Sequence, residues 1–583
     1  MDQGNRLFTD AEGQAGIAGI DSFAGAATAP TGTNSGYSSG STEEQLMAIG
    51  EVLEVQGQLC VCAFSKSVRD QAQNDAARDG QMPGQIGSFV KMKMQERHVF
   101  AVVRNVKSAG AGTDGQLFAE LDFIGELMPS AGAREGAIFR RGVTKFPMPG
   151  QSVFLATGQD MRTIFAPMSA TSANIGYVYP TDSVKAAIDI DAVLSRHLAV
   201  LGSTGTGKST VVSLILQKIV EQSPFGHVLI FDPHDEYSKA FPEHGVRHDM
   251  AELNLPFWLM NLEEHIEVLI GIDSTDREQE IDILKRVLIA ARRKDKPSNA
   301  VSHITADSPV PYKLADFIAE IQNSMGRLEK SENLTPYLRL RAKLEELRAD
   351  ARYNFMFSGL VVSDDFSHTL STLFRMPSHG RPVSILDLSG VPSDIVNVVV
   401  SVISRIAFDF VRIARDSGEC RPLLLVCEEA HRYVPENPEL HKAVKKVLDK
   451  IAKEGRKYGI GLCLVTQRPS DISESILSQC GTMLALRLNN ERDQKFVEKS
   501  IPDGAQGFLN VLPSLRNREC LLVGEGISAP SRVMIYDVDP NLLPNSNDPS
   551  FSDIWTSQDA SDSFVPNIVE RWRGDNAARL KRG

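Results

Sequence analysis

The sequence has little of what membrane, secreted or histone-like proteins require. Its longest apolar stretches are interrupted by charges well before the roughly 20 residues that a membrane-spanning helix needs. Seven cysteines are too few and too irregularly spaced for a disulfide framework, and the close pair Cys60 and Cys62 fits neither a zinc knuckle nor a redox pair. Lys and Arg total 62 against 74 Asp and Glu, which excludes a uniformly basic coat for nucleic acid. We therefore expect no membrane span and a reducing, cytoplasmic setting.

With 583 residues the chain is long enough for several domains, and its composition changes along its length. Residues 1–46 are rich in Gly, Ala, Ser and Thr, which predicts a flexible leader without a targeting signal. Residues 47–165 hold short β-patterned runs separated by Gly and Pro, which predicts a small barrel or sandwich. The runs are Ile49–Val55, Leu59–Phe64, His98–Val106, Phe118–Ile124 and Gln151–Ala156.

Near residue 185 the β-rich runs begin to alternate with helical patterns, which is typical of a parallel sheet in an α/β domain. We assign residues 166–262 and 361–540 to this domain, 263–360 to a helical insertion and 541–583 to a tail. Charges within Ile395–Ile413 favour a buried core helix over a membrane helix. The predicted strands are nearly all apolar, which indicates that both sheet faces are covered; they are His197–Leu201, His227–Asp232, Pro382–Leu388, Leu423–Cys427, Ile460–Thr466 and Thr482–Leu488.

The segment HLAVLGSTGTGKST contains the pattern GxxxxGKS between an apolar strand and a helical pattern. Its glycines let backbone N–H groups turn toward phosphate oxygens, Lys208 can reach the β and γ oxygens, and Ser209 can bind Mg²⁺. A glycine-rich turn matching by chance is the alternative, which the flanking strand and helix disfavour. The predicted nucleotide-binding residues are Gly202, Ser203, Thr204, Gly205, Thr206, Gly207, Lys208, Ser209 and Thr210.

A second strand, in RPLLLVCEEAH, ends in two carboxylates that fit a Walker B pattern. We expect Glu428 to hold Mg²⁺ through water and Glu429 to act as the general base. The usual first residue is Asp, and a charge pair at a helix N-terminus is the alternative. Gln467 follows another strand and is a candidate γ-phosphate sensor, or else a polar cap. The segment FDPHDEY also ends a strand at this edge, where open α/β sheets bind ligands.

Missing motifs and long ordered segments together identify a family. We find neither an NKxD guanine reader nor an LSGGQ transporter signature. The combination of GSTGTGKST, DPHDEY, CEEAHRYVP and KEGRKYGIGLCLVTQRPSDISESILSQCGTMLALRLNN resembles the HerA branch of the HerA/FtsK superfamily of hexameric DNA-translocating ATPases. The resemblance runs from about residue 47 to the C-terminus. It has three departures: Asp235 stands where the family often has Gly, the Walker B pair is Glu428 and Glu429, and the Gly-, Ala- and Ser-rich leader is not part of the shared pattern.

The resemblance implies a RecA-like P-loop ATPase core that uses ATP and Mg²⁺, an N-terminal HAS-type barrel and the helical insertion. It also implies that Glu429 is the catalytic base, that Gln467 is the sensor, and that Arg456 acts in trans on a neighbouring subunit. An arginine finger stabilises charge on the transferred phosphoryl group, so such a site works only at a subunit boundary of a ring. A cation that complements a helix C-terminus is the alternative for Arg456.

Two further segments have open interpretations. Residues 441–457 predict a helix with one apolar and one basic face, which either tracks a DNA backbone without reading sequence or contacts a subunit or solvent. The tail carries Trp555 and Trp572, and related rings use such tails to brace the next protomer or the nucleotide site; loose disorder is the alternative. His234 and His431 lack a second metal ligand at the right spacing, so we expect them to face solvent or to support the site.

The sequence therefore predicts an ATP- and Mg²⁺-dependent homohexameric motor that pumps duplex DNA, without sequence preference, through a central pore. We find no PD-(D/E)xK nuclease signature, so cutting would need a partner. HerA-like proteins pair with nucleases in DNA end processing or, in bacteria, with nucleases or NAD-consuming effectors in antiviral defence. The competing hypothesis is a ring-shaped scaffold that assembles and regulates such an effector without translocation, and a metabolic P-loop kinase is a third.

Overall fold

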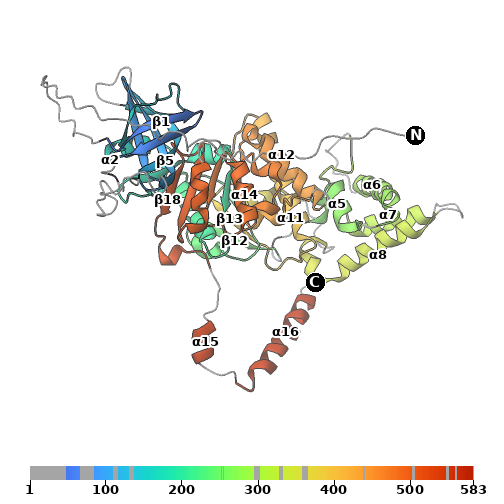
Figure 1. Ribbon diagram of the computed structural model, residues 1–583. Helices are drawn as coiled ribbons and strands as arrows, with labels where there is room; N and C mark the ends of the chain where they lie inside the picture. The colour runs from blue at the N-terminus through green and yellow to red at the C-terminus, as the bar shows by residue number, and fades with distance from the viewer. Residues whose placement is uncertain are drawn as a thin grey trace, which may run out of the picture. The chain divides into compact units, whose positions relative to one another are not determined.

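The computed structural model describes residues 48–65, 68, 84–108, 116–129, 137–250, 253, 255–272, 274–294, 303–326, 333–357, 366–437, 440–501, 506–545, 551–557 and 561–581 (Figure 1). The chain divides into the units Met1–Leu46 and Met47–Gly583. The predicted leader, residues 1–46, lies outside the described residues.

A closed antiparallel barrel forms the first folded part. Its strands pair in the order β2-β1-β7-β3-β4-β5, and pairing of β2 with β5 closes the ring, while β6 extends from β5. Alternate side chains of each strand enter a core of small and aliphatic residues such as Val52, Cys62 and Met92. The strands are β1 (Gly50–Gln56), β2 (Leu59–Phe64), β3 (Phe89–Met94), β4 (Arg97–Ser108), β5 (Leu117–Pro129), β6 (Ala137–Arg141) and β7 (Ser152–Leu155).

The five strands predicted in this region are confirmed, and the closed ring decides for a barrel over a sandwich. Sequence reasoning missed β3 and β6. In β3, Lys91 alternates with apolar residues yet is only 7% exposed, because its Nζ lies 2.6 Å from Asp160. A buried lysine disguises the strand in the sequence, because the partner that allows its burial lies 69 residues further along the chain.

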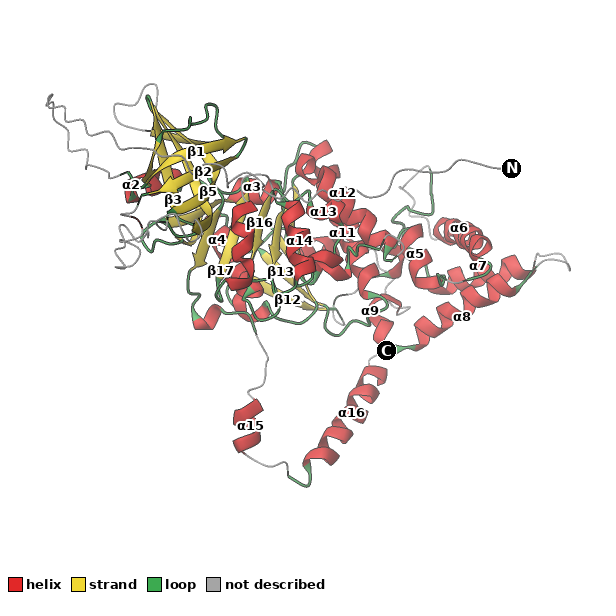
Figure 2. Cartoon of the chain, viewed as in Figure 1, coloured by secondary structure: helices red, strands yellow, loops and turns green. Residues whose placement is uncertain are grey.

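An eleven-stranded mixed sheet forms the centre of the second part (Figure 2). Its order is β12-β13-β11-β14-β15-β10-β16-β17-β18-β8-β9, parallel as far as β16 and antiparallel beyond it. The strands are β8 (Ser172–Val178), β9 (Lys185–Asp189), β10 (Leu198–Leu201), β11 (Val228–Asp232), β12 (Gly245–Asp249), β13 (Val383–Asp387), β14 (Leu423–Cys427), β15 (Ile460–Thr466), β16 (Thr482–Ala485), β17 (Glu519–Gly524) and β18 (Ser531–Ile535).

All six strands predicted for the sheet are confirmed, and every residue of β10, β11, β13, β14, β15 and β16 is buried. Five further strands, β8, β9, β12, β17 and β18, were not predicted. The helices that pack with this sheet are α3 (Ile190–Ser195), α4 (Lys208–Gln222), α11 (Val396–Asp416), α12 (Lys442–Tyr458), α13 (Glu474–Leu477) and α14 (Glu491–Ser500); α2 (Gly158–Ile164) follows the barrel. The core helix expected over Ile395–Ile413 is α11.

The stretch predicted as a helical insertion contains α5 (Leu262–Leu269), α6 (Arg277–Lys294), α7 (Leu314–Gly326), α8 (Thr335–Ala349) and α9 (Asn354–Phe357), and α10 (Phe366–Phe374) follows. In α6, Leu284, Leu288 and Ala291 are buried on one face. Short 3₁₀ turns complete the chain: η1 (Ser238–Ala240), η2 (Phe257–Leu259), η3 (Ala351–Tyr353), η4 (Ala430–Arg432), η5 (Pro469–Asp471), η6 (Gln506–Ser514) and η7 (Pro540–Leu542).

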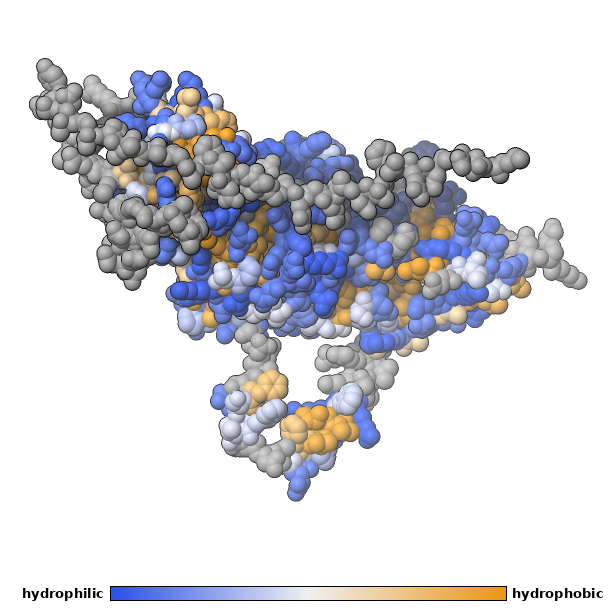
Figure 3. Space-filling model, viewed as in Figure 1, coloured by the Kyte–Doolittle hydropathy of each residue, from blue (hydrophilic) through white to orange (hydrophobic). Residues whose placement is uncertain are grey.

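The tail holds two helices, α15 (Phe551–Ser557) and α16 (Phe564–Lys581). Hydrophobic side chains are exposed on both, as Figure 3 shows; they are Phe551, Ile554, Trp555, Phe564, Val565, Ile568 and Trp572. Across the described part of the chain, no helix combines the length and the apolar character needed to cross a membrane.

A buried ion pair joins the helical insertion to the core. Glu264 of α5 is fully buried, and Arg405 of α11 contacts both of its carboxylate oxygens, at 3.0 and 2.8 Å. Ser401 Oγ and the backbone N–H of Asn261 donate to the same carboxylate, at 2.9 and 2.8 Å. Four donors therefore surround the Glu264 carboxylate, at a depth where an unpaired charge would be costly.

We expect Arg405→Ala to reduce the free energy of unfolding by about 3–5 kcal/mol, because it leaves the Glu264 charge buried without a partner. Arg412→Ala on the same helix is the matched control. Arg412 is exposed and lies 3.7 and 3.6 Å from Asp409 and Asp416, so its loss should cost less than about 1 kcal/mol. Urea unfolding compares the two variants, and equal losses would contradict the assignment.

Candidate active site

The candidate site lies at the carboxyl edge of four neighbouring parallel strands. Leu201, the last residue of β10, pairs with Thr466, the last residue of β15. Cys427 at the end of β14 pairs with Leu464 of β15 on one side and with Phe231 of β11 on the other. The loops that follow these strands therefore begin at one edge, which brings GSTGTGKST, CEEAH, TQRP and DPHDEY together.

The glycine-rich loop runs from β10 to the first residue of α4, Lys208. Gly205 and Gly207 have φ of 73° and 96°, a conformation that favours glycine. At Gly202 a Cβ atom would lie 2.8 Å from Thr206 Oγ1 and 2.9 Å from Leu486 Cβ. Backbone conformation thus favours glycine at Gly205 and Gly207, and close side-chain packing favours it at Gly202. The loop leaves the N-terminus of α4 available for an anion.

Lys208 is a buried cation surrounded by carboxylates. It is 8% exposed, and its Nζ donates to the Ser203 carbonyl oxygen at 3.2 Å. Burial lowers the pKa of Lys208, and the negative charges of Glu428, Glu429 and Glu236 oppose that decrease. A phosphate group that enters the site meets both this cation and these carboxylates.

Glu428 directly follows β14 and is 2% exposed. Tyr237 OH donates a hydrogen bond of 2.5 Å to Glu428 Oε2. Burial raises the pKa of Glu428 to about 8, although the bond from Tyr237 acts in the opposite direction. The Glu that departs from the usual Walker B Asp is therefore held by a tyrosine from the DPHDEY segment.

Glu429 follows Glu428 and is in the left-handed region, with φ of 54°. Gln467 Nε2 donates to Glu429 Oε1 at 3.0 Å, and Gln467 Oε1 accepts from Thr204 Oγ1. Gln467 therefore connects the P-loop with the proposed base. The structure brings these three predicted residues together.

His431 supports this arrangement. Its Nδ1 lies 3.1 Å from Glu429 Oε2 and 3.2 Å from Thr466 Oγ1. The first contact places the His431 ring against the Glu429 carboxylate. Burial alone would raise the pKa of Glu429, but His431, Lys208 and His234 outweigh it and lower the pKa. Glu429 is therefore ionised, with one oxygen available to accept a proton.

The DPHDEY segment folds back over the P-loop. Asp232 accepts the backbone N–H groups of His234 and Tyr237 at 3.2 and 2.9 Å. Asp235 has φ of 54°, so the position where the family often has Gly needs the left-handed conformation, which Asp tolerates better than most residues. Ser209 Oγ donates to Glu236 Oε2 at 2.5 Å. Sequence reasoning noted this segment but gave no role to Glu236 or Tyr237.

The oxygen atoms around Ser209 suit Mg²⁺. The Ser209 hydroxyl and the carboxylates of Glu236 and Glu428 are hard donors of the kind that this ion prefers. Among the described residues, no three His, Cys, Asp or Glu side chains form a metal site by themselves. Mg²⁺ at phosphate sites takes most of its ligands from phosphate and water, so the donor set fits a nucleotide-bound ion rather than a permanent one.

Arg456 lies away from the site of its own chain. It is exposed in the last turn of α12, directly before β15, whereas Gln467 follows the other end of that strand. A seven-residue strand is about 20 Å long. Arg456 makes no hydrogen bond or ion pair with any residue that the structure describes.

Most other cations of α12 have partners within the chain. Lys445 Nζ donates to the carbonyl oxygens of Pro435 and Glu436, at 2.9 and 3.3 Å. Further contacts join Lys446 to Glu263, Lys453 to Asp449 and Lys450 to the ring of Phe408. DNA contact through this helix stays a prediction. Fewer of its cations are free to contact a DNA backbone than the sequence alone suggests.

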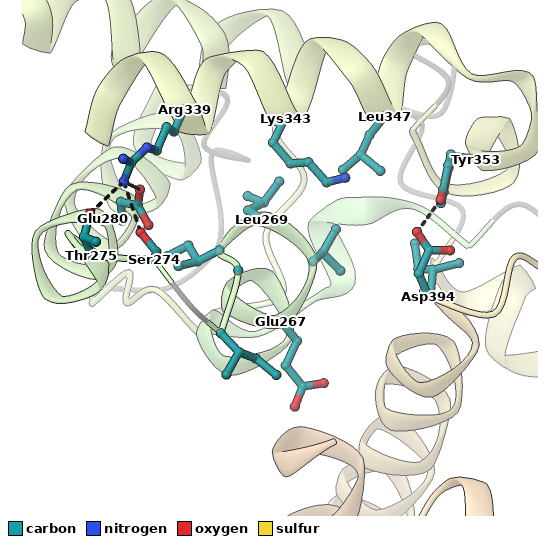
Figure 4. A pocket seen from close by; sticks show the side chains of 15 residues that line it. Glu267, Leu269, Ser274, Thr275, Glu280, Arg339, Lys343, Leu347, Tyr353 and Asp394 are labelled. Atoms are coloured by element: carbon teal, nitrogen blue, oxygen red, sulfur yellow. Dashed lines mark hydrogen bonds and ion pairs between the residues drawn. The ribbon is translucent and has the colours of Figure 1, made fainter. Parts of the chain in front are cut away.

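A cavity of about 600 Å³ lies between the insertion and α11, away from the P-loop (Figure 4). Its polar walls are already paired: Arg339 contacts Asp276 at 3.0 Å, and Tyr353 OH donates to Asp394 at 2.5 Å. Glu267, another wall residue, accepts the backbone N–H of Ala443 at the start of α12. The cavity thus lacks the converging free polar groups of a catalytic site.

Comparison with known families agrees with this geometry. Residues 173–407 match the family DUF87, described as "Helicase HerA, central domain". This range includes the P-loop and DPHDEY segments and ends before the Walker B strand.

Curated relatives extend the similarity along the chain. It is 27% identical over 445 residues to "Probable helicase MJ1565" of Methanocaldococcus jannaschii, covering 75% of this chain and 77% of the relative. It is 27% identical over 428 residues to "DNA double-strand break repair helicase HerA" of Pyrococcus furiosus, covering 67% and 73%. A solved structure of VirB4 from Thermoanaerobacter pseudethanolicus superposes with a TM-score of 0.49 at 17% identity, over 64% of this chain and 99% of that one.

The raised pKa of Glu428 predicts a pH dependence of stability without nucleotide and metal. Between its ordinary value of 4.5 and about 8, the folded protein keeps the Glu428 proton while the unfolded chain loses it. Stability therefore falls as pH rises through this window, by at most about 1.4 kcal/mol per pH unit.

Glu428→Gln is neutral at every pH and should remove this contribution. Urea unfolding at several pH values measures it, with the exposed Glu436→Gln as control. If wild type and Glu428→Gln show the same pH dependence, Glu428 is not protonated in the folded protein.

Proposed function

This chain belongs to the HerA-like helicase family and is an ATPase of that type, and we propose that it is a homohexameric motor that moves duplex DNA through a central pore. The kinship supports the choice of DNA, because curated relatives carry the names helicase and DNA double-strand break repair helicase. The proposed contact with DNA is independent of sequence. The protein has a net charge of −12, so any contact with DNA must be confined to a local surface.

We assign the roles of the site from its contacts. The P-loop, Gly202–Thr210, binds the triphosphate through its backbone and through Lys208. Gln467 senses the γ-phosphate from its position between Thr204 and Glu429. Glu429 accepts the proton of the attacking water, and His431 beside its Oε2 atom helps to keep the carboxylate ionised. Mg²⁺, held by Ser209 and through water by Glu428, would neutralise the charge that develops on the phosphates.

The position of Arg456 carries the proposal of a ring. An exposed arginine without a partner, at the opposite end of β15 from its own P-loop, is suited to reach the nucleotide of a neighbouring subunit. An arginine finger contributes a factor of about 10³–10⁵ to hydrolysis. A single copy of the chain would then be nearly inactive.

The remaining assignments complete the proposal. The domains are the barrel 47–165, the ATPase core 166–262 and 361–540, the insertion 263–360, and the tail 541–583, which braces a neighbouring subunit or the nucleotide site through its exposed aromatic residues. A nuclease or an NAD-consuming effector is the proposed partner, in DNA end processing or antiviral defence. The seven free cysteines suit the cytoplasm.

One observation favours the alternative of a ring-shaped scaffold that regulates an effector without translocation. Intramolecular partners occupy most cations of α12, so few remain for a DNA backbone on this helix.

Mixing two inactive variants tests the shared site. We expect Arg456→Ala to lower kcat about a thousandfold and Glu429→Gln to abolish base catalysis. A mixed ring contains boundaries at which an intact Glu429 meets an intact Arg456, so up to about a quarter of the wild-type rate should return. ATP hydrolysis of the equimolar mixture measures this.

Lys457→Ala, the adjacent exposed cation, is the matched control and should keep the wild-type rate. If Arg456→Ala is active alone, or if the mixture stays inactive, the finger is another residue or the site is complete within one chain.

The response to DNA separates the motor from the scaffold. A motor should hydrolyse ATP severalfold faster with long duplex DNA, and should displace a triplex-forming strand from it in an ATP-dependent manner. A ring whose hydrolysis ignores DNA and displaces nothing would exclude the motor and favour the scaffold.

A further inference from the structure

Glu236 occupies a position for which the proposed reaction has no assigned role. It follows Asp235, whose left-handed conformation directs the chain back toward the start of α4. There Glu236 Oε2 accepts the hydroxyl proton of Ser209 at 2.5 Å. Ser209 is the P-loop hydroxyl that would bind Mg²⁺, so Glu236 contacts a proposed metal ligand.

The charge of Glu236 acts throughout the phosphate site. It is among the charges that raise the pKa of Lys208, Glu428 and Asp232. A metal-free triphosphate bound to Lys208 would therefore face Glu236 in addition to the ionised Glu429. Repulsion between like charges a few ångströms apart disfavours that complex, and a divalent cation between them removes the repulsion.

The tail fixes Glu236 from outside the site. The backbone N–H of Asn545 donates to the Glu236 carbonyl oxygen at 2.7 Å. Gln217 Nε2 of α4 donates to the carbonyl oxygens of Ala240 and Leu542, at 3.0 and 3.3 Å, which joins η1 and η7. The carboxylate is thus attached to a braced loop rather than to a free one.

We propose that Glu236 is a positioning residue that makes this site select metal-loaded nucleotide over metal-free nucleotide. It keeps the Ser209 hydroxyl oriented in the nucleotide-free site and opposes phosphates that arrive without a cation. The inference rests on the proposed ATPase site but not on translocation, the ring or DNA.

Nucleotide binding with and without Mg²⁺ tests this role. Calorimetric titration of the full chain with adenylyl imidodiphosphate gives Kd values with excess Mg²⁺ and with EDTA. We expect Glu236→Gln to bind the metal-free analogue on the order of fivefold more tightly and the Mg²⁺ complex more weakly. The ratio of the two Kd values should therefore fall at least fivefold.

Two variants complete the design. Glu236→Asp keeps the charge and should retain most of the Mg²⁺ preference. Glu243→Gln removes an exposed carboxylate shortly after η1, away from the P-loop, and should leave the ratio unchanged. Thermal unfolding confirms that each variant is folded.

The proposal is overturned if Glu236→Gln keeps the wild-type ratio, or if it loses both forms of the nucleotide, as a structural residue would. Neither result would bear on whether DNA stimulates ATP hydrolysis, which is measured separately. Conversely, a protein that ignores DNA but shows the expected change in ratio would refute the motor and retain the role of Glu236.

Discussion

The structure depends on keeping one cation, Lys208, buried among carboxylates at the edge of a sheet. Glu428, Glu429 and Glu236 come from two different strand ends, and each would be costly near the others without Lys208, a hydroxyl or an amide donor. Parallel pairing of β11, β14, β15 and β10 solves this problem, because it brings four carboxyl ends to one edge in a fixed order. The barrel, the insertion and the tail attach to that core, whereas the partners described for Lys208 all come from the core itself.

Sequence patterns predicted the parts of the fold that are continuous and apolar. The strands β10, β11, β13, β14, β15 and β16 are buried on both faces, so their own residues reveal them. The strands β8, β9 and β18 mix buried residues with half-buried or exposed ones, and β8 pairs with β18 from a distant part of the chain, as between Val533 and Val178. Lys91 in β3 shows the same limit, because only its distant partner Asp160 explains a lysine inside a barrel.

The site was predictable to the level of motifs but not of individual contacts. The spacing of the P-loop and the two carboxylates after β14 identified Lys208 and Glu428. No local pattern reveals that Asp235 and Glu429 adopt left-handed conformations. Those two conformations decide that Glu236 faces Ser209, that Tyr237 lies under Glu428, and that Glu429 meets Gln467 and His431.

The helix α12 explains how an insertion far from the P-loop can matter to the reaction. Glu267 of the insertion accepts the backbone N–H of Ala443 at 2.7 Å and thereby caps the N-terminus of α12. Two residues later Lys445 donates a hydrogen bond to the carbonyl oxygen of Pro435, in the loop that follows the Walker B carboxylates. The same helix ends with Arg456, the proposed finger. A helix of 17 residues thus connects the insertion, the loop of the base and a proposed subunit boundary through direct contacts.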